Sequence, residues 1–389
     1  MEPSISGAMD RAVESRQPSP PSVLDTPVTF EGWRESSGSE ATAREVRIGL
    51  FAPDSGQAWR GANLAVERAN AEGGVGGLPL KVVARWADDP WSGGAKEVVR
   101  LAYQDNAAAV LGSWDGAATH VAEQVATKAR IPLIAPVSSD PTLTYIRIPW
   151  IFRLPPDDEA QADAVVGEGI LARSLANPGL ITSSDHDGRT FAHAVLNRLA
   201  EAGMAPAFHL QLPPGAQVSG LASRIRSFSP GCLIIRATPH LTSRVMEELS
   251  GQGVQLPLLA PWIPGLSLED LRLRYSGDIL AVQPFHTAAN PDYAEFHQEY
   301  RSRYGTRPTP AAAYYYDAVN LLVEALEGAG GSGRPHLRDA IAEASGFVGV
   351  TGAISWDNGG GNQADPVLLL LPEPTSVEEG PQDSQGGFR

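Results

Sequence analysis

Short apolar segments alternate with longer segments of helical periodicity along most of the chain, and this alternation is the feature that most restricts its fold. The segment 46–51 reads VRIGLF, and 61–71 follows with alanine and valine side chains on one helical face. Further strands are predicted at 80–86, 108–111, 132–135, 179–182, 207–212, 232–236, 256–259 and 279–282. Helices are predicted between them at 96–103, 117–128, 188–202, 218–228, 239–252 and 267–274. Strands that alternate with helices of ~10–15 residues form right-handed βαβ units, so the sequence predicts an α/β fold on parallel sheets.

The alternation restarts after 150–153, which predicts two doubly wound lobes rather than one. Beyond residue 284 the pattern changes to three helices, and strand signals return only near the end of the chain. These helices are predicted at 292–304, 310–328 and 335–344, and the two strands at 353–356 and 367–371. A run of helices after the second lobe indicates that the chain returns to cover the first lobe. Such a chain crosses between the lobes more than once, which predicts a hinge.

Composition excludes several classes of protein. The 389 residues are two to three times the usual ~150-residue domain. A formal net charge of −15 disfavours nucleic acid and anionic membrane surfaces as partners. The single cysteine, Cys232, excludes an internal disulfide framework and every multi-cysteine metal site. Val367–Leu371 and every other apolar run in the sequence are far shorter than the ~18 residues that a membrane helix needs, so a membrane-embedded protein is not expected.

The two ends of the chain differ from its body. Residues 1–44 are rich in Ser, Pro, Glu and Gly, and residues 373–389 have a similar composition. Segments of this kind cannot bury enough apolar surface to offset their ordering entropy, so both are predicted to be disordered. The first segment also contains no apolar stretch typical of a signal peptide, and no lipobox cysteine.

Catalytic signatures are absent from the sequence. There is no P-loop, no His-Glu-x-x-His and no nucleophile elbow. One Gly-x-Gly-x-x-Gly match, at Gly328, Gly330 and Gly333, follows a predicted helix rather than a strand, so it is interpreted as an interhelical loop. No catalytic residue, cofactor or metal site is therefore predicted.

Two acidic clusters follow predicted strands. Asp185-His186-Asp187-Gly188 lies at the carboxyl end of a strand, where open α/β sheets bind ligands, and the alternative is a turn that caps the next helix. Asp88-Asp89 is interpreted as a helix cap rather than an acid/base pair. Of Tyr314-Tyr315-Tyr316, at least two are expected to pack in the core.

Read in order, several motifs resemble the type I periplasmic solute-binding proteins, in the branch that binds leucine, isoleucine and valine or amides and urea for ABC importers. The turn Asn70-Ala71-Glu72-Gly73-Gly74-Val75-Gly76-Gly77 is similar to the family's N-x-x-G-G-x-x-G. Ile131-Pro132-Leu133-Ile134-Ala135-Pro136 precedes Ser138-Ser139-Asp140-Pro141-Thr142-Leu143-Thr144, and the stretch from Pro136 is similar to the family's P-x-x-T-x-P-x-L-T. The remaining pieces are Asp88-Asp89, Gly112-Ser113-Trp114-Asp115, Phe152-Arg153, Tyr316-Asp317-Ala318-Val319 and Gly352-Ala353-Ile354-Ser355-Trp356-Asp357.

The resemblance implies two doubly wound parallel-sheet lobes joined by a three-strand hinge, with a ligand held between them. Lobe I is expected at 45–153 plus 284–347, and lobe II at 154–283 plus 348–372. The crossings are expected near 152–154, 282–284 and 347–351.

The family's binding positions are carried over one by one. The serine that grips a ligand carboxylate corresponds to Gly116, which leaves only the N–H groups of Gly116 and Ala117 for an anion. Ser139 keeps the hydroxyl of the family's threonine, whereas Trp262 replaces the glutamate that pairs with an ammonium group. The full set of candidate ligand-binding residues is Trp59, Trp114, Asp115, Gly116, Ala117, Ser138, Ser139, His186, Asp187, Thr238, Trp262 and Tyr314.

These replacements lead to an expectation about the ligand. Aliphatic amino acids are expected to bind poorly unless Asp115, Asp185 or Asp187 supplies the missing charge partner, and Trp59, Trp114 and Trp262 suggest an aromatic-walled pocket for an amide or aromatic acid. The function implied is the substrate-binding component of an ABC importer, not an enzyme, with permease subunits as partners. The alternative is a ligand sensor that reports to a signalling partner. An extracytoplasmic location with a lost or truncated signal is expected, against a cytoplasmic one.

Overall fold

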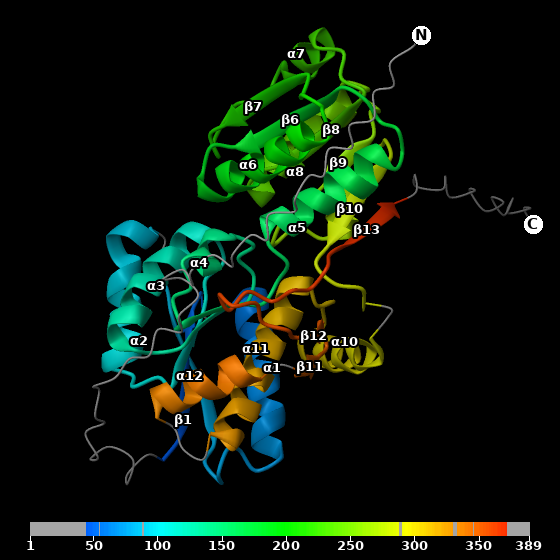
Figure 1. Cartoon of the computed structure of the whole chain (residues 1–389). Coiled ribbons are helices and arrows are strands. Elements are labelled where there is room, and N and C mark those ends of the chain that lie inside the picture. Colours follow the sequence, from blue (N-terminus) through cyan, green and yellow to red (C-terminus); the bar gives the residue numbers. More distant parts are fainter. Residues whose placement is uncertain are drawn as a thin grey trace, which may run out of the picture. The chain divides into compact units, whose positions relative to one another are not determined.

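The computed structural model describes residues 44–371, except 54, 88, 288–289, 330–332 and 345 (Figure 1). The predicted disordered segments therefore lie outside the described residues, apart from Arg44, and so do Asp88 and Gly330 of the motifs above.

The first sheet has five parallel strands in the order β2-β1-β3-β4-β5. Its strands are β1 Val46–Phe51, β2 Leu80–Arg85, β3 Ala109–Leu111, β4 Leu133–Ala135 and β5 Ile151–Arg153. Side chains alternate between the two faces of a strand, so Ile48 and Leu50 of β1 pack in one core cluster and Phe51 packs in another. Both faces of this sheet are thus covered, which is the arrangement expected for a doubly wound lobe.

Helices from distant parts of the chain supply these two layers. They are α1 Gly56–Ala71, the π-helical turn η3 Pro90–Gly94, α2 Ala95–Tyr103, α3 Gly116–Ala129, α4 Thr142–Tyr145, α10 Pro291–Tyr304, α11 Pro310–Gly328 and α12 Arg334–Glu343. Helices α1 and α11 approach so closely that a Cβ atom on Gly61 would lie 2.1 Å from the carbonyl oxygen of Ala312. The predicted return of the chain to the first lobe is therefore confirmed, and all three tyrosines at 314–316 are buried in its core.

The second sheet has six strands in the order β13-β10-β9-β8-β6-β7, all parallel except β13. Its strands are β6 Pro178–Ser183, β7 Phe208–Leu212, β8 Cys232–Arg236, β9 Leu258–Ala260, β10 Ile279–Gln283 and β13 Val367–Leu371. Successive residues of β8 again face opposite layers, with Leu233 and Ile235 in one cluster and Cys232 and Ile234 in the other. The predicted fold class, two doubly wound α/β lobes, is confirmed.

The helices of the second sheet include one that the sequence analysis missed. They are α5 Asp158–Asp163 with its π-helical continuation η4 Ala164–Leu171, α6 His186–Glu201, α7 Leu221–Ser227, α8 Pro239–Gly251 and α9 Leu268–Arg274. The missed helix begins at Asp157, whose carboxylate accepts a hydrogen bond from the Ala160 N–H at 2.9 Å. Asp157 followed by two acidic residues is an ordinary helix-start signal that could have revealed it.

The third crossing lies later in the chain than the predicted 347–351. Strands β11 Val348–Gly349 and β12 Gly352–Ala353 form an antiparallel hairpin, and β13 pairs with β10 only after residue 366. The hairpin is held by Asp317 of α11, whose carboxylate accepts hydrogen bonds from the N–H groups of Val350 and Thr351. The strand predicted at 353–356 is reduced to β12 and a single bridge between Trp356 and Asn362. The exact division into lobes stays a prediction.

None of the helices in the described part of the chain is long and apolar enough to span a membrane.

Candidate functional site

A cavity of about 290 Å³ lies where the carboxyl ends of several strands and the helices that follow them meet. Trp114, Asp115 and Ala117 follow β3, while Asp185, His186 and Asp187 follow β6. The other lining residues are Trp91, Arg236, Thr238, Pro239, Ile263 and Pro264. Open α/β sheets bind ligands at this edge, so the cavity is the candidate binding site.

Three carboxylates line the cavity, and each accepts a backbone hydrogen bond at a helix start. Asp115 accepts from the Ala118 N–H at 2.7 Å, and Asp185 accepts from the Gly188 N–H at 2.8 Å. Asp187 reaches across to the Gly116 N–H at 2.9 Å. Burial raises the pKa of Asp115 and raises that of Asp187 to about 6, because a buried carboxylate loses its hydration. The capping interpretation thus holds for Asp185, while Asp115 and Asp187 remain poorly compensated.

In this structure the N–H groups predicted to anchor an anion, those of Gly116 and Ala117, hydrogen-bond with carboxylates of the protein. The Gly116 N–H donates to Asp187, and the N–H groups of Ala117 and Ala118 hydrogen-bond with Asp115. The positive end of α3 is therefore already occupied by carboxylates of the protein itself.

Arg236 is the cavity residue that the sequence analysis missed. It ends the otherwise apolar strand β8, its side chain is buried, and it lines the cavity. Its Nε has no hydrogen-bond partner among the described residues. Its positive charge counteracts the raised pKa values of Asp158 and Asp187. The sequence signal that could have identified Arg236 is its charge at the carboxyl end of the apolar segment CLIIR.

Ser139 lies in a buried network rather than at the cavity lining. Its hydroxyl donates a hydrogen bond to Asp158 Oδ1 at 2.7 Å, so the predicted contact of Ser139 with a ligand stays a prediction. Burial raises the pKa of Asp158 to about 7, although Arg236 and Ser139 counteract this rise. Ser138 is likewise buried.

Of the predicted aromatic wall, Trp114 lines the cavity, whereas Trp262 is buried in the core of the first sheet and the partly buried Trp59 packs against that core. The ring of Trp262 lies 5.9 Å from that of Tyr314, and the Tyr314 hydroxyl donates to the Pro284 carbonyl. The second aromatic residue at the cavity is Trp91, which follows the cap Asp89 as predicted.

Thr238 lines the cavity and also caps α8, where its hydroxyl accepts from the Leu241 N–H.

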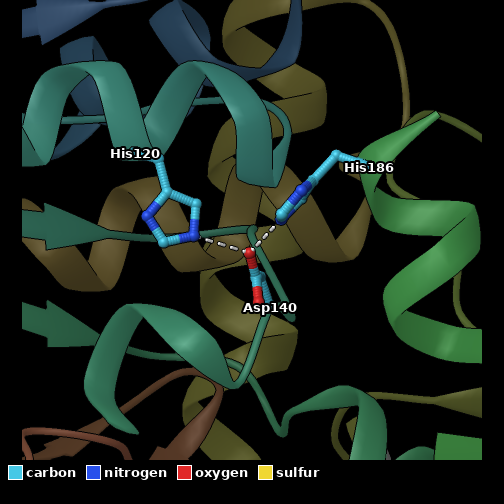
Figure 2. A group of neighbouring side chains, drawn as sticks. All are labelled: His120, Asp140 and His186. Atoms are coloured by element: carbon cyan, nitrogen blue, oxygen red, sulfur yellow. Dashed lines mark hydrogen bonds and ion pairs between the residues drawn. The ribbon is translucent and has the colours of Figure 1, made fainter. Parts of the chain in front are cut away.

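Two histidine side chains contact the same carboxylate beside the cavity. The Nε2 atoms of His186 and His120 lie 2.5 and 3.0 Å from Asp140 Oδ2 (Figure 2). Burial alone would raise the pKa of Asp140, but hydrogen bonds with His120, His186 and Thr142 outweigh it and lower that pKa. The sequence analysis did not foresee this group, because its members are 20 and 46 residues apart.

Comparison with known proteins agrees with the fold. An amino acid binding protein of Pseudomonas aeruginosa is 26% identical over 307 residues, which cover 74% of this chain and 79% of the relative. A Leu/Ile/Val-binding protein homolog of Brucella abortus is 22% identical and covers 84% of this chain and 90% of its own length.

Two solved structures show the same fold. The branched-chain amino acid transporter substrate binding protein of Streptococcus pneumoniae, in complex with isoleucine, gives a TM-score of 0.73 at 22% identity and covers 83% of this chain and 95% of its own. A solute binding protein of R. palustris in complex with benzoate gives a TM-score of 0.73 at 18% identity. The match covers 86% of this chain and 98% of that protein's chain.

Residues 45–370 match the periplasmic binding protein family along nearly the whole folded body. The resemblance inferred from the sequence motifs is therefore confirmed, and the solute-binding interpretation is supported over the signalling one. This chain belongs to the periplasmic binding protein family.

Proposed function

We propose that this chain is the substrate-binding component of an ABC importer and captures a small solute that carries a carboxylate and an ammonium group. The observation that supports this most directly is Arg236, which is buried with an unpaired Nε in the same cavity as Asp115 and Asp187. A buried N–H group without an acceptor is costly, so a ligand carboxylate that accepts from the Arg236 guanidinium would be favourable.

The two buried carboxylates favour a ligand that also carries a cationic group. Asp115 and Asp187 have raised pKa values because they are buried, and an ammonium group beside them would favour their charged forms. A solute with both charges satisfies both sides of the cavity, whereas an aromatic acid such as benzoate leaves the aspartates without a cation.

This proposal takes up the stated exception to the expected poor binding of aliphatic amino acids, in which an aspartate supplies the missing charge partner. That expectation rested on the missing serine at Gly116 and the missing glutamate at Trp262. The cavity offers Arg236 and Asp187 instead, so the two charge partners are supplied from other positions. A cavity of about 290 Å³ is at the small end for ligand sites, which suits a small amino acid with its side chain against Trp114 and Ile263.

Isothermal titration calorimetry with a matched ligand series tests the two charge contacts. L-Leucine has both groups, leucinamide lacks the carboxylate, 4-methylpentanoate lacks the ammonium group, and benzoate and butyramide represent the aromatic-acid and amide alternatives. Loss of one charged hydrogen bond costs about 1.5–3 kcal/mol, so each truncated ligand should bind ~10- to 100-fold more weakly than leucine. Equal or tighter binding of benzoate or butyramide would contradict the zwitterion proposal.

Variants assign each contact to its residue. Arg236→Gln should weaken the binding of leucine and 4-methylpentanoate but leave that of leucinamide little changed. Asp187→Asn should weaken the binding of leucine and leucinamide but leave that of 4-methylpentanoate little changed. Arg236→Lys keeps the charge and guards against a folding defect of the glutamine variant. Arg224→Gln, on the exposed side of α7, is the matched control. Weakening of all three ligands to the same extent by both variants would rule out separate charge contacts.

Membership in the periplasmic binding protein family supports the proposed transport role, permease partner and extracytoplasmic location. Deletion of the gene should abolish uptake of the radiolabelled solute, and fractionation of cells that express the native locus should recover the protein outside the cytoplasm. Unchanged uptake together with loss of a transcriptional response to the solute would favour the sensor alternative. We also expect the solute to be recovered unaltered after prolonged incubation, as for a binding protein without enzymatic activity.

A further inference from the structure

Three potential metal ligands converge from separate parts of the chain. His120 comes from α3, Asp140 from the loop after β4 and His186 from the first turn of α6 (Figure 2). Their ligand atoms all lie within 4.8 Å of one another, and among the described residues they form the one such group. Figure 2 shows both imidazoles pointing at the same carboxylate oxygen of Asp140.

The surroundings of His120 direct its Nε2 toward this point. Its Nδ1 lies 2.6 Å from Glu123 Oε2, and a carboxylate accepts a hydrogen bond, so Nδ1 carries the proton in the neutral ring. The Nε2 lone pair then faces Asp140 Oδ2 at 3.0 Å. At this distance the two atoms are joined either by a proton on Nε2, as in an imidazolium ring, or by a metal ion, and the Thr142 hydroxyl oxygen lies 2.9 Å from the same nitrogen. A histidine whose other nitrogen donates to a carboxylate is the usual arrangement around a metal ion.

Asp140 is held in the same way. Its Oδ1 accepts from both the N–H and the hydroxyl of Thr142, at 2.9 and 2.7 Å, which leaves Oδ2 to the histidines. Asp140 is buried, and both histidines are partly exposed, so an ion could enter from the solvent side.

Gly116 keeps space open at this point. A Cβ atom there would lie 2.9 Å from Asp140 Oδ2 and 2.9 Å from the His186 ring carbon Cδ2. The absence of a side chain is thus required for Asp140 and His186 to meet. This observation is independent of the ligand set itself.

We propose that His120 Nε2, Asp140 Oδ2 and His186 Nε2 bind a divalent transition-metal ion, with Zn²⁺ as the first candidate. Imidazole nitrogen with one carboxylate suits Zn²⁺, whereas Ca²⁺ and Mg²⁺ prefer oxygen ligands. Tetrahedral bonds of about 2.0–2.2 Å put neighbouring ligand atoms about 3.4 Å apart, so the observed 2.5 and 3.0 Å contacts must open by less than ~1 Å. The remaining position opens near the cavity, which His186 also lines.

The ion would join α3 and the β4 loop to α6, and hence the layer of the first sheet to that of the second. The site does not depend on the identity of the captured solute, since its ligands belong to the protein.

Zinc titration calorimetry of the tag-free chain, dialysed first against a chelator, tests the site. We expect one Zn²⁺ per chain, and Co²⁺ should give the visible absorption bands of a four-coordinate ion. His120→Gln, His186→Gln and Asp140→Asn should each weaken Zn²⁺ binding by 10-fold or more. His193→Gln, on the exposed side of the same helix α6, is the matched control and should bind as wild type does.

Glu123→Gln tests the positioning role of Glu123. It should weaken Zn²⁺ binding by about 10- to 100-fold while the four-coordinate Co²⁺ spectrum persists at saturation.

Equal Zn²⁺ affinity of wild type and the histidine variants would contradict the proposed metal site. If wild type, His120→Gln and His186→Gln take up Zn²⁺ with the same affinity, the three side chains form only a proton-held ion pair and the proposal is wrong. Circular dichroism of each variant separates a loss of ligands from a loss of fold. Leucine titrations of the chelated protein report on the proposed function separately, so failure of either proposal is seen without the other.

Discussion

At the scale of single residues, the absence of a side chain at Gly116 decides what the site can contain. Asp187 Oδ1 would lie 2.6 Å from a Cβ atom at this position, and Asp140 Oδ2 would lie 2.9 Å from it. The lack of a side chain at Gly116 therefore admits the Asp187 carboxylate, which accepts a hydrogen bond from the Gly116 N–H. The start of α3 is thus occupied by an acidic side chain of the protein.

Gly116→Ala should push Asp187 and Asp140 away and weaken leucine binding by ~10-fold or more, with a loss of about 1–3 kcal/mol in the free energy of unfolding. Urea denaturation and calorimetry measure the two effects. Gly167→Ala is the matched control, because a Cβ atom there meets nothing within 4 Å and alanine favours the helix. Wild-type affinity in Gly116→Ala would show that the carboxylates do not hold the ligand.

At the scale of secondary-structure elements, Asp317 of α11 fixes the hairpin formed by β11 and β12. Its Oδ1 accepts from the Val350 N–H at 2.9 Å, and its Oδ2 accepts from the Thr351 N–H at 2.7 Å. Burial nevertheless raises its pKa to about 6, because these hydrogen bonds only partly replace hydration of the charge. The hairpin is thus held by a carboxyl group whose ionisation lowers the free energy of unfolding.

Asp317 should make stability fall as the pH rises from about 4 to about 6. In this window the carboxyl ionises in the unfolded chain, where its pKa is near 3.8, but stays protonated in the folded one. The free energy of unfolding of wild type should therefore drop by on the order of 2–3 kcal/mol relative to Asp317→Asn.

Urea denaturation at a series of pH values measures this difference. Asp292→Asn replaces an exposed carboxylate on α10 and serves as the control. A difference between wild type and Asp317→Asn that stays constant from pH 4 to pH 6 would contradict the prediction.

At the scale of the whole folded body, the cavity draws its charged groups from both sheets. Asp115 caps α3 beside the first sheet, whereas Asp187 follows β6 and Arg236 ends β8, both strands of the second sheet. A solute that contacts all three is linked to the folding of both sheets, since binding stabilises only the states that present the complete site.

Differential scanning calorimetry should therefore show a rise in Tm of the whole transition when leucine is added. At a ligand concentration of 100 times Kd, binding adds about 2.7 kcal/mol to stability, which raises Tm by roughly 5 °C. Asp187→Asn should show a smaller rise at the same concentration. If two transitions are resolved and only one of them moves, the solute contacts residues of one sheet alone.

The sequence by itself determined the architecture of this protein. Strand β8, strand β13 and helix α11 lie at the residues predicted for them, because hydrophobic periodicity and helix caps are local properties that a single sequence displays. It also indicated the edge of the sheets where Asp115, His186, Asp187 and Thr238 line the cavity. Motif order was sufficient for the family, since several of the motifs occupy turns or strand ends of this fold.

Only the tertiary structure decided which groups pair with one another. Asp187 reaches Gly116, and His186 reaches Asp140 and lies near His120, across separations of 46 to 71 residues that no local pattern encodes. Packing likewise buried Trp262 and Tyr314 in the core and turned Ser139 toward Asp158, although sequence position alone suggested ligand contacts. The physical reason is that binding chemistry depends on distance and desolvation, and both arise only when the elements pack against one another.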